Sequence, residues 1–156
     1  VSEHFHNSLY NLIKDYENIT FIFSQGPGSY TGLRLIELFS FFFQRHHYKA
    51  YPFYYFEVPQ WLQAEGSFIS YAYKQESFTY SWLNLESKMN LSPYEHKSYE
   101  NFFILPGEEH RYTDGKVITL EMIVQTLPNI QKISRQLKSF YYRNESYEFK
   151  IPIPKS

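Results

Sequence analysis

The sequence predicts an α/β protein, because segments with helical periodicity alternate with short β-branched and aromatic runs in its first third. A helical pattern at 2–16 precedes a strand-like run at 19–23, and a second helical pattern at 30–45 precedes a run at 49–56. Two strands joined through a helix imply a right-handed crossover and parallel pairing. Two alternating runs then predict an antiparallel hairpin. The sheet content is therefore expected to be mixed.

The first expected helix has one apolar stripe, because residues three and four positions apart share a helical face. The members of this stripe are Phe5, Leu9, Leu12, Ile13 and Tyr16. The stripe predicts that this helix packs against another element along one side.

A glycine turn separates the first strand from the second helix. Its residues are Gly26, Pro27, Gly28, Ser29, Thr31, Gly32 and Arg34. We expect Gly26 and Gly28 to adopt backbone angles or close approaches that a Cβ would forbid, and the hydroxyls of the turn to cap the helix. Such a turn either binds an anion or simply starts a helix. The glycine spacing matches neither the dinucleotide fingerprint nor the phosphate-binding P-loop, which favours a capped helix start with Gly32 allowing close packing.

The second helix carries an unusually wide apolar arc of roughly 160°. The arc consists of Leu35, Ile36, Leu38, Phe39, Phe42 and Phe43, with Leu33 and Phe41 outside it. One sheet face cannot easily cover so wide an arc. Two readings stay open, namely burial by the C-terminal helices and an interface with another protein.

The remainder of the chain predicts a second group of elements after a boundary near 57–66, which separates domains at 1–60 and 61–156. The expected elements are a short helix at 60–65, hairpin strands at 67–73 and 77–83, a polar stretch at 86–101, a strand at 102–105, a charged loop at 106–115, helices at 118–126 and 130–138 broken at Pro128, and an extended tail at 151–154. Glu108 and its neighbours are read as a solvated loop.

Composition excludes several classes of function. The net charge of −1 and the pI near 6.6 give no global attraction to phosphate backbones. The chain has no cysteine, which removes thiolate catalysis, and its six histidines lack metal-ligand spacing. It also lacks a nucleophile elbow or an evident base beside a serine. We expect a cytoplasmic protein without a membrane span, a metal, a cofactor or catalytic residues.

The nine residues from Gly26 to Arg34 read Gly-Pro-Gly-Ser-Tyr-Thr-Gly-Leu-Arg. This order resembles the Gly-Pro-Gly-Ser-Phe-Thr-Gly-hydrophobic-Arg signature of the bacterial TsaB (YeaZ) family. The run Phe-Tyr-Tyr-Arg-Asn at 140–144 is similar to the family's closing segment. The family's opening strands have no counterpart before the first helix, so the first lobe would lack them. Tyr71-Ala-Tyr73 stands where family members commonly have Asp-Ala-Arg, so no role of that Asp or Arg is carried over.

The resemblance implies an actin-like, RNase H-like fold in two lobes and a non-catalytic role. TsaB-like proteins bind the paralogous TsaD subunit, which threonylcarbamoylates the adenosine beside the tRNA anticodon, with a TsaE-like ATPase as a third component. The chain would form a homodimer when alone and meet tRNA only indirectly. The implied interface consists of Leu9, Leu12, Leu35, Leu38, Phe39 and Phe42. Two alternatives stay open: an actin-like nucleotide-binding enzyme, either a kinase or a glycoprotease-like peptidase, and a homodimeric interaction module.

Overall fold

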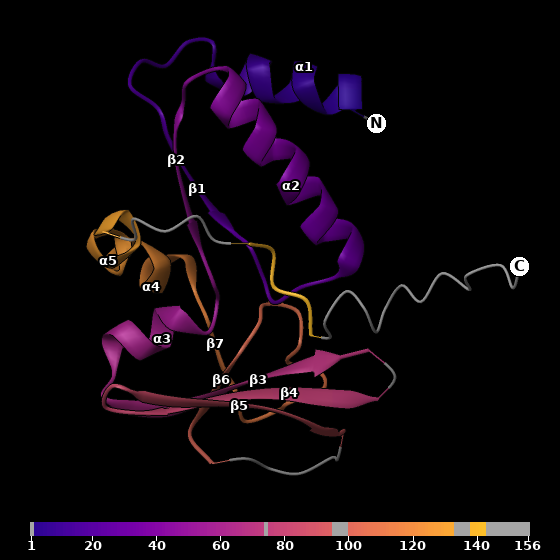
Figure 1. Cartoon of the computed structure of the whole chain (residues 1–156), viewed down its shortest axis with the longest axis vertical. Coiled ribbons are helices and arrows are strands. Elements are labelled where there is room, and N and C mark those ends of the chain that lie inside the picture. Colours follow the sequence, from indigo (N-terminus) through magenta and orange to yellow (C-terminus); the bar gives the residue numbers. More distant parts are fainter. Residues whose placement is uncertain (1, 74, 95–99, 133–137, 143–156) are drawn as a thin grey trace, which may run out of the picture.

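A computed structural model describes residues 2–73, 75–94, 100–132 and 138–142 of the chain. Its first half forms a parallel two-stranded sheet with two helices (Figure 1). These elements are α1 (Ser2–Ile13), β1 (Thr20–Ser24), α2 (Tyr30–Arg45) and β2 (Lys49–Phe53). The two strands pair from Thr20 opposite Lys49 to Ser24 opposite Phe53. The predicted crossover through α2 is therefore confirmed, and so is the α/β class.

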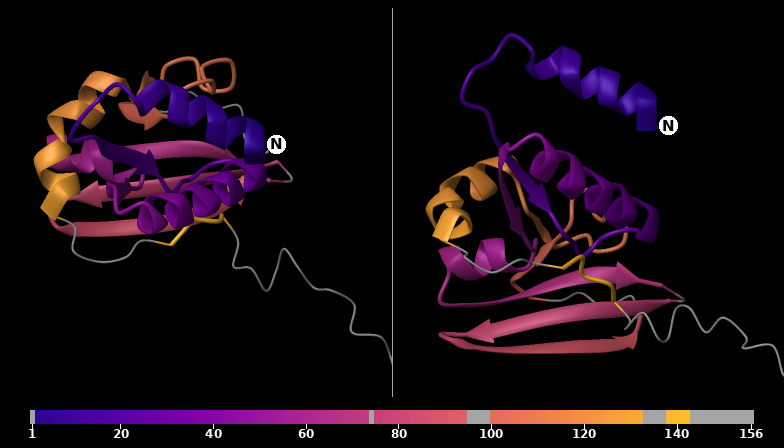
Figure 2. Two further views of the ribbon diagram at one scale, coloured as in Figure 1. Left: turned by 90° about the horizontal axis from the view of Figure 1, so that it is seen from above. Right: turned by 45° about the horizontal axis from the view of Figure 1, so that its top comes forward.

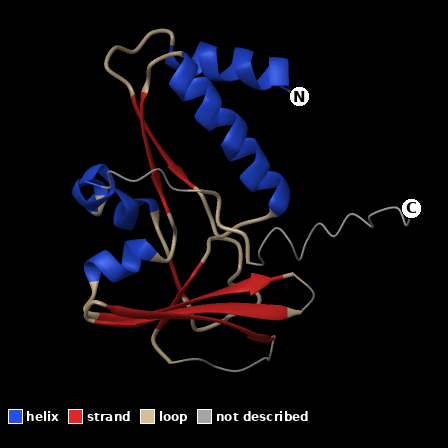
Figure 3. Ribbon diagram, viewed as in Figure 1, coloured by secondary structure: helices blue, strands red, loops and turns tan. Residues whose placement is uncertain are grey.

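The described residues after β2 contain a five-stranded sheet in the order β5-β4-β3-β6-β7. Its elements are α3 (Glu57–Leu62), β3 (Glu65–Ala72), β4 (Glu76–Leu83), β5 (Glu86–Pro93), β6 (Phe102–Ile104), β7 (Lys116–Val117), α4 (Leu120–Gln125) and α5 (Leu127–Lys132). Strands β3, β4 and β5 form an antiparallel meander, whereas β6 pairs in parallel with both β3 and β7. The α2 helix flanks one side of the β1–β2 pair and the α4–α5 helices flank the other (Figure 2). The five-stranded sheet lies at the end of the molecule away from α1 (Figure 3).

Several predicted boundaries are wrong for identifiable reasons. The β2 strand ends at Phe53 instead of 56, and α3 begins at Glu57 because Pro59 fits the first helical turn, where its missing N–H is not needed. For the same reason Pro128 lies inside the first turn of α5 and does not separate two helices. The α4 helix begins only after Thr119, whose hydroxyl accepts a hydrogen bond from the Met122 N–H at 3.3 Å.

The polar stretch at 86–101 contains β5, which the sequence did not reveal. Most side chains of this strand are exposed, so its residues show no apolar alternation. Its backbone pairs with β4 from Leu83 opposite Glu86 to Glu76 opposite Pro93. The expected tail at 151–154 and residues 133–137 of the expected last helix lie outside the described residues.

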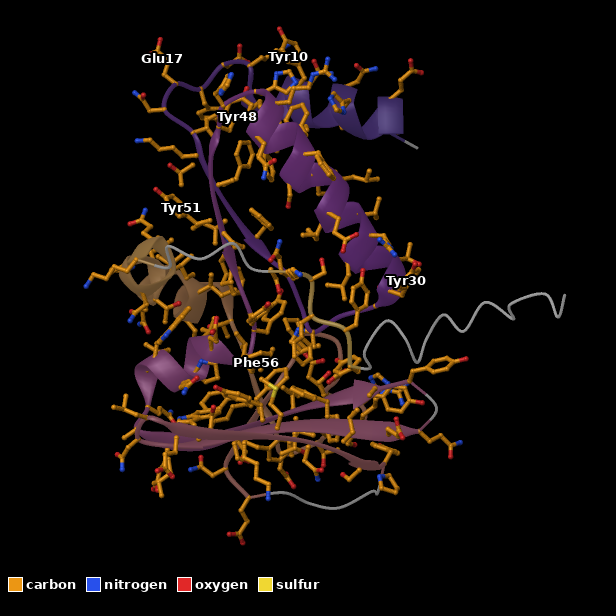
Figure 4. The ribbon with its side chains drawn as sticks, in the orientation of Figure 1. Tyr10, Glu17, Tyr30, Tyr48, Tyr51 and Phe56 are labelled. Atoms are coloured by element: carbon orange, nitrogen blue, oxygen red, sulfur yellow. The ribbon has the colours of Figure 1, made fainter. Side chains whose placement is uncertain are left out.

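The main core lies between the β1–β2 pair and the five-stranded sheet. Phe56 is 2% exposed at this junction (Figure 4), and its ring centroid lies 4.4 Å from that of Tyr80. Buried members from both halves of the sequence are Phe53, Phe56, Val58, Phe68, Ala72, Phe78, Tyr80, Trp82, Phe103, Ile118 and Ile130. A smaller cluster of Ile69, Phe102, Ile104 and Tyr112 uses residues alternate to these on β3 and β6. The division at 57–66 into two domains stays a prediction.

Replacing Phe56 with alanine should lower the free energy of unfolding by about 3–5 kcal/mol, because it leaves a cavity between the two sheets. Leu85, which is 98% exposed, provides the matched control, and Leu85→Ala should change stability by less than about 0.5 kcal/mol. Urea denaturation measures both values. Equal stability of the two variants would contradict the central position of Phe56.

Candidate functional site

The N–H and the carbonyl of Gly26 both make hydrogen bonds that hold the glycine turn. The Gly26 N–H donates to Ser24 Oγ at 3.0 Å, and the Gly26 carbonyl accepts from the Tyr55 N–H at 2.9 Å. Gly26 has a φ of 113° and precedes a cis peptide bond to Pro27. Gln25, Gly26 and Pro27 are buried. The turn is thus part of the packed interior where β1 ends.

Ser29 is the N-cap of α2. Its Oγ accepts a hydrogen bond from the Gly32 N–H at 3.1 Å, which satisfies one of the free amides at the helix start. A Cβ on Gly32 would lie 3.0 Å from this same oxygen, so the glycine leaves room for the cap. Thr31 is exposed and is not the N-cap residue.

The expectation that Gly28 adopts a backbone angle or a close approach that a Cβ would forbid is wrong. Its φ lies outside the left-handed region, and a Cβ built there would meet no atom within 4 Å. Gly26 carries the constraint instead. At its positive φ, a Cβ would lie 2.9 Å from the Phe140 carbonyl oxygen and 3.2 Å from Leu33 Cδ2.

Residues 138–142, here called the strap, cover this turn. The Phe140 N–H donates to the Gln25 carbonyl at 2.6 Å. The strap also contacts α2, because the Tyr141 hydroxyl donates to Glu37 Oε1 at 3.1 Å. The turn is therefore closed over Gly26, an arrangement that fits a packed helix start better than an open cradle for an anion.

A charged network joins the start of α2 to the strap. Arg34 Nη1 donates to Glu37 Oε2 at 2.9 Å, and Arg34 Nε donates to the Tyr30 hydroxyl at 3.0 Å. The hydrogen bonds to Tyr30 and Glu37 raise the pKa of Arg34. Burial, followed by the hydrogen bond to Glu37, raises the pKa of Tyr141 to about 12. Arg34 is exposed, so this network orients side chains more than it stabilises the fold.

Only part of the apolar arc of α2 is buried. Leu33 and Phe43 are buried, although Leu33 lies outside the predicted arc. Leu38 is 59% exposed and Phe41 is 71% exposed, and Leu35 is also exposed. We call Leu35, Leu38 and Phe41 the outer α2 face. The reading that the C-terminal helices bury the whole arc is therefore wrong.

The other residues of the predicted interface have mixed positions. Leu12 is exposed, whereas Leu9, Phe39 and Phe42 are half-buried. The Phe42 ring packs against His6 of α1 and against His46, with centroid distances of 4.5 Å and 4.4 Å. Phe42 thus joins α1 to α2, and it offers less surface to a partner than the outer α2 face does. The side chain of Phe5 lies outside the described part of the chain.

Potential metal ligands are scattered among the described residues. No group of three or more His, Asp or Glu side chains in this part of the chain could hold a metal ion. None of the helices within the described ranges is long and apolar enough to cross a membrane. The sequence-based interpretation missed Glu108, which is half-buried and whose carboxylate folds back against β3. No local pattern signals this, because the contact joins residues 37 positions apart.

Comparison with known proteins gives a structural likeness but no sequence relative. No protein-family model and no curated protein sequence matches the chain. The crystal structure of an uncharacterized protein with similarity to peptidase YEAZ, from Pseudomonas aeruginosa, superposes with a TM-score of 0.49 at 12% identity. The match covers 88% of this chain and 80% of that one. At this level the likeness assigns no family, and the fold defines the chain as a mixed α/β protein.

Gly26→Ala should destabilise the protein by about 1–3 kcal/mol, because alanine is strained at this φ and its Cβ would press on the strap. Gly28→Ala is the matched control and should be neutral or raise stability by up to about 1 kcal/mol. Thermal and urea unfolding compare the two variants. A larger loss from Gly28→Ala than from Gly26→Ala would contradict the assignment of the constraint to Gly26.

Proposed function

We propose that this chain is a non-catalytic, TsaB-like subunit that binds and activates a TsaD-like protein. In this role it promotes threonylcarbamoyl transfer to the adenosine beside the tRNA anticodon, with a TsaE-like ATPase completing the system in the cytoplasm. The nine-residue resemblance at Gly26 to Arg34 motivates the family. The single observation that carries the mode of action is the exposure of large apolar side chains on the outer α2 face.

Exposed apolar surface of this kind is expected at a protein interface. Leu38 and Phe41 lie on a 16-residue helix that is anchored by its cap and by buried Leu33 and Phe43. A rigid helix presents its side chains to a partner with little loss of conformational entropy. The outer α2 face therefore suits docking on a partner helix or, when the chain is alone, on a second copy.

Activation would follow from differential binding. If the chain binds the active conformation of the TsaD-like protein more tightly than the inactive one, it shifts the population toward the active state without taking part in the chemistry. The net charge of −1 is consistent with tRNA being held by the partner and not by this chain.

Leu38→Glu and Phe41→Glu should each weaken binding to the TsaD-like protein by at least about tenfold, because each buries an unpaired charge in the interface. Leu85→Glu makes the same chemical change at the exposed β4–β5 turn and should leave affinity unchanged. Titration calorimetry measures the affinities, and circular dichroism checks folding. A native chain that stays monomeric at micromolar concentration and binds no TsaD-like protein would overturn the proposal.

The purified chain should not hydrolyse ATP or cleave peptide bonds, because it lacks a P-loop lysine and a nucleophile with an evident base. Deleting its gene should lower threonylcarbamoyladenosine in tRNA, as measured by mass spectrometry of nucleosides. Unchanged modification would contradict the TsaB-like role. ATP turnover that disappears in Ser29→Ala would instead favour the actin-like enzyme.

A further inference from the structure

Glu108 places a carboxylate in a largely dry position at the end of β3. Its backbone is fixed in the loop between β6 and β7, where its carbonyl accepts from the N–H groups of Arg111 and Tyr112 at 2.9 and 3.1 Å. Its Oε1 accepts from the Tyr71 N–H at 3.0 Å and from Ser70 Oγ at 3.4 Å. Its Oε2 is buried and has no hydrogen-bond partner among the described residues. One oxygen is thus held while the other is desolvated.

This position favours the neutral acid. Leaving a charged oxygen buried without a partner is unfavourable, and burial raises the pKa of the Glu108 carboxyl to about 7. The Tyr71 N–H, the Ser70 hydroxyl and the positive charge of Arg111 oppose the shift, whereas the negative charge of Glu109 adds to it. The Arg111 guanidinium lies over the Tyr71 ring at 3.9 Å. Tyr94 beside Tyr71, Tyr112 on the loop and Tyr142 on the strap are further titratable groups of this cluster.

The same cluster holds the end of the strap. Ser70 is fully buried, and its hydroxyl donates to Glu108 while it accepts from the Tyr142 hydroxyl. Burial is the main cause of the raised pKa of Tyr142; the hydrogen bond with Ser70 opposes this rise, whereas the Glu108 charge adds to it. The Tyr142 ring packs against Phe78 with a centroid distance of 5.5 Å. Tyr142 therefore connects the strap to the carboxyl through one buried serine.

Two polar side-chain atoms buried under the closed strap lack hydrogen-bond partners among the described residues. They are the Ser139 hydroxyl of the strap and the Gln25 side-chain oxygen beside it. Such unpaired polar atoms reduce the net gain from closing the strap. A modest change in the anchor at Tyr142 can consequently alter how often the strap opens.

We propose that Glu108 is a proton-dependent latch for the strap: the neutral carboxyl keeps residues 138–142 closed over the glycine turn, and its ionisation releases them. An ionised Oε2 needs water, and admitting water to this buried atom requires the cluster that includes Ser70 and Tyr142 to loosen. Opening the strap would expose the Gly26 backbone and free Glu37 from Tyr141. The inference is independent of the proposed partner.

The direction of the pH effect follows from the raised pKa. The stabilisation of the closed strap is complete below the ordinary glutamate pKa near 4.5 and is lost as the pH rises through about 7. The lost stabilisation corresponds to at least about a tenfold change in the opening equilibrium.

Amide hydrogen exchange tests the latch, with the Phe140 N–H as the probe because it donates to the Gln25 carbonyl inside the closed strap. Its protection factor, corrected for intrinsic exchange, should fall at least about tenfold between pH 5.5 and 8.5. Glu108→Gln should keep protection high and independent of pH. Glu109→Gln, a matched change at the exposed neighbour, should keep the native profile.

A flat profile for the native chain, or an equal fall in Glu108→Gln, would overturn the proposal. If Glu108→Gln does not fold, two other measurements test the latch. The side-chain carbon signal of Glu108 in the native chain should titrate near 7, and a midpoint near the ordinary value of 4.5 would also overturn it. Tyr142→Phe, which keeps the ring and removes the hydroxyl, should show low and pH-independent protection of Phe140. Native-like protection in that variant would contradict the link through Ser70.

Discussion

The packing of Phe56 joins the β1–β2 pair to the five-stranded sheet. Its ring lies 4.4 Å from Tyr80 of β4 and 5.2 Å from Phe140 of the strap, measured between centroids. It lies shortly after β2, which ends at Phe53, so it fixes the end of the parallel pair onto the five-stranded sheet. The strap can cover the glycine turn only because this junction positions Phe140 beside Gly26. The turn and the strap therefore both depend on one aromatic contact region.

Features with a local cause were predictable from the sequence. The bounds of α2 agree with its prediction at 30–45. Both signals for this helix, the serine cap and the regular apolar pattern, come from residues that are close together in the sequence. The crossover between β1 and β2 follows from the same local order. The β5 strand was missed because an outer strand with exposed faces has no apolar alternation. Its existence depends on backbone pairing with β4, which composition does not reveal.

The candidate site shows the same distinction between local and distant causes. The sequence identifies the wide apolar arc of α2, but the position of the β1–β2 pair decides which of its side chains are buried. Leu33 therefore became core although it lies outside the predicted arc, and Phe41 became the most exposed of the outer residues. Gly26 and Gly28 look alike in sequence, and only the approach of Phe140 distinguishes them. Glu108 could not be recognised, because its environment is assembled from β3, its own loop and the strap.

The outer position of β5 has a consequence for how this chain associates with others. A strand at the border of a sheet exposes backbone groups that invite another strand to pair, which leads to aggregation. Here Glu86 and Lys88 place opposite charges along the strand, and Pro93 removes a backbone donor at its end. These residues discourage strand addition along most of its length. The border of the five-stranded sheet at β5 is therefore poorly suited to pairing with a strand of another chain.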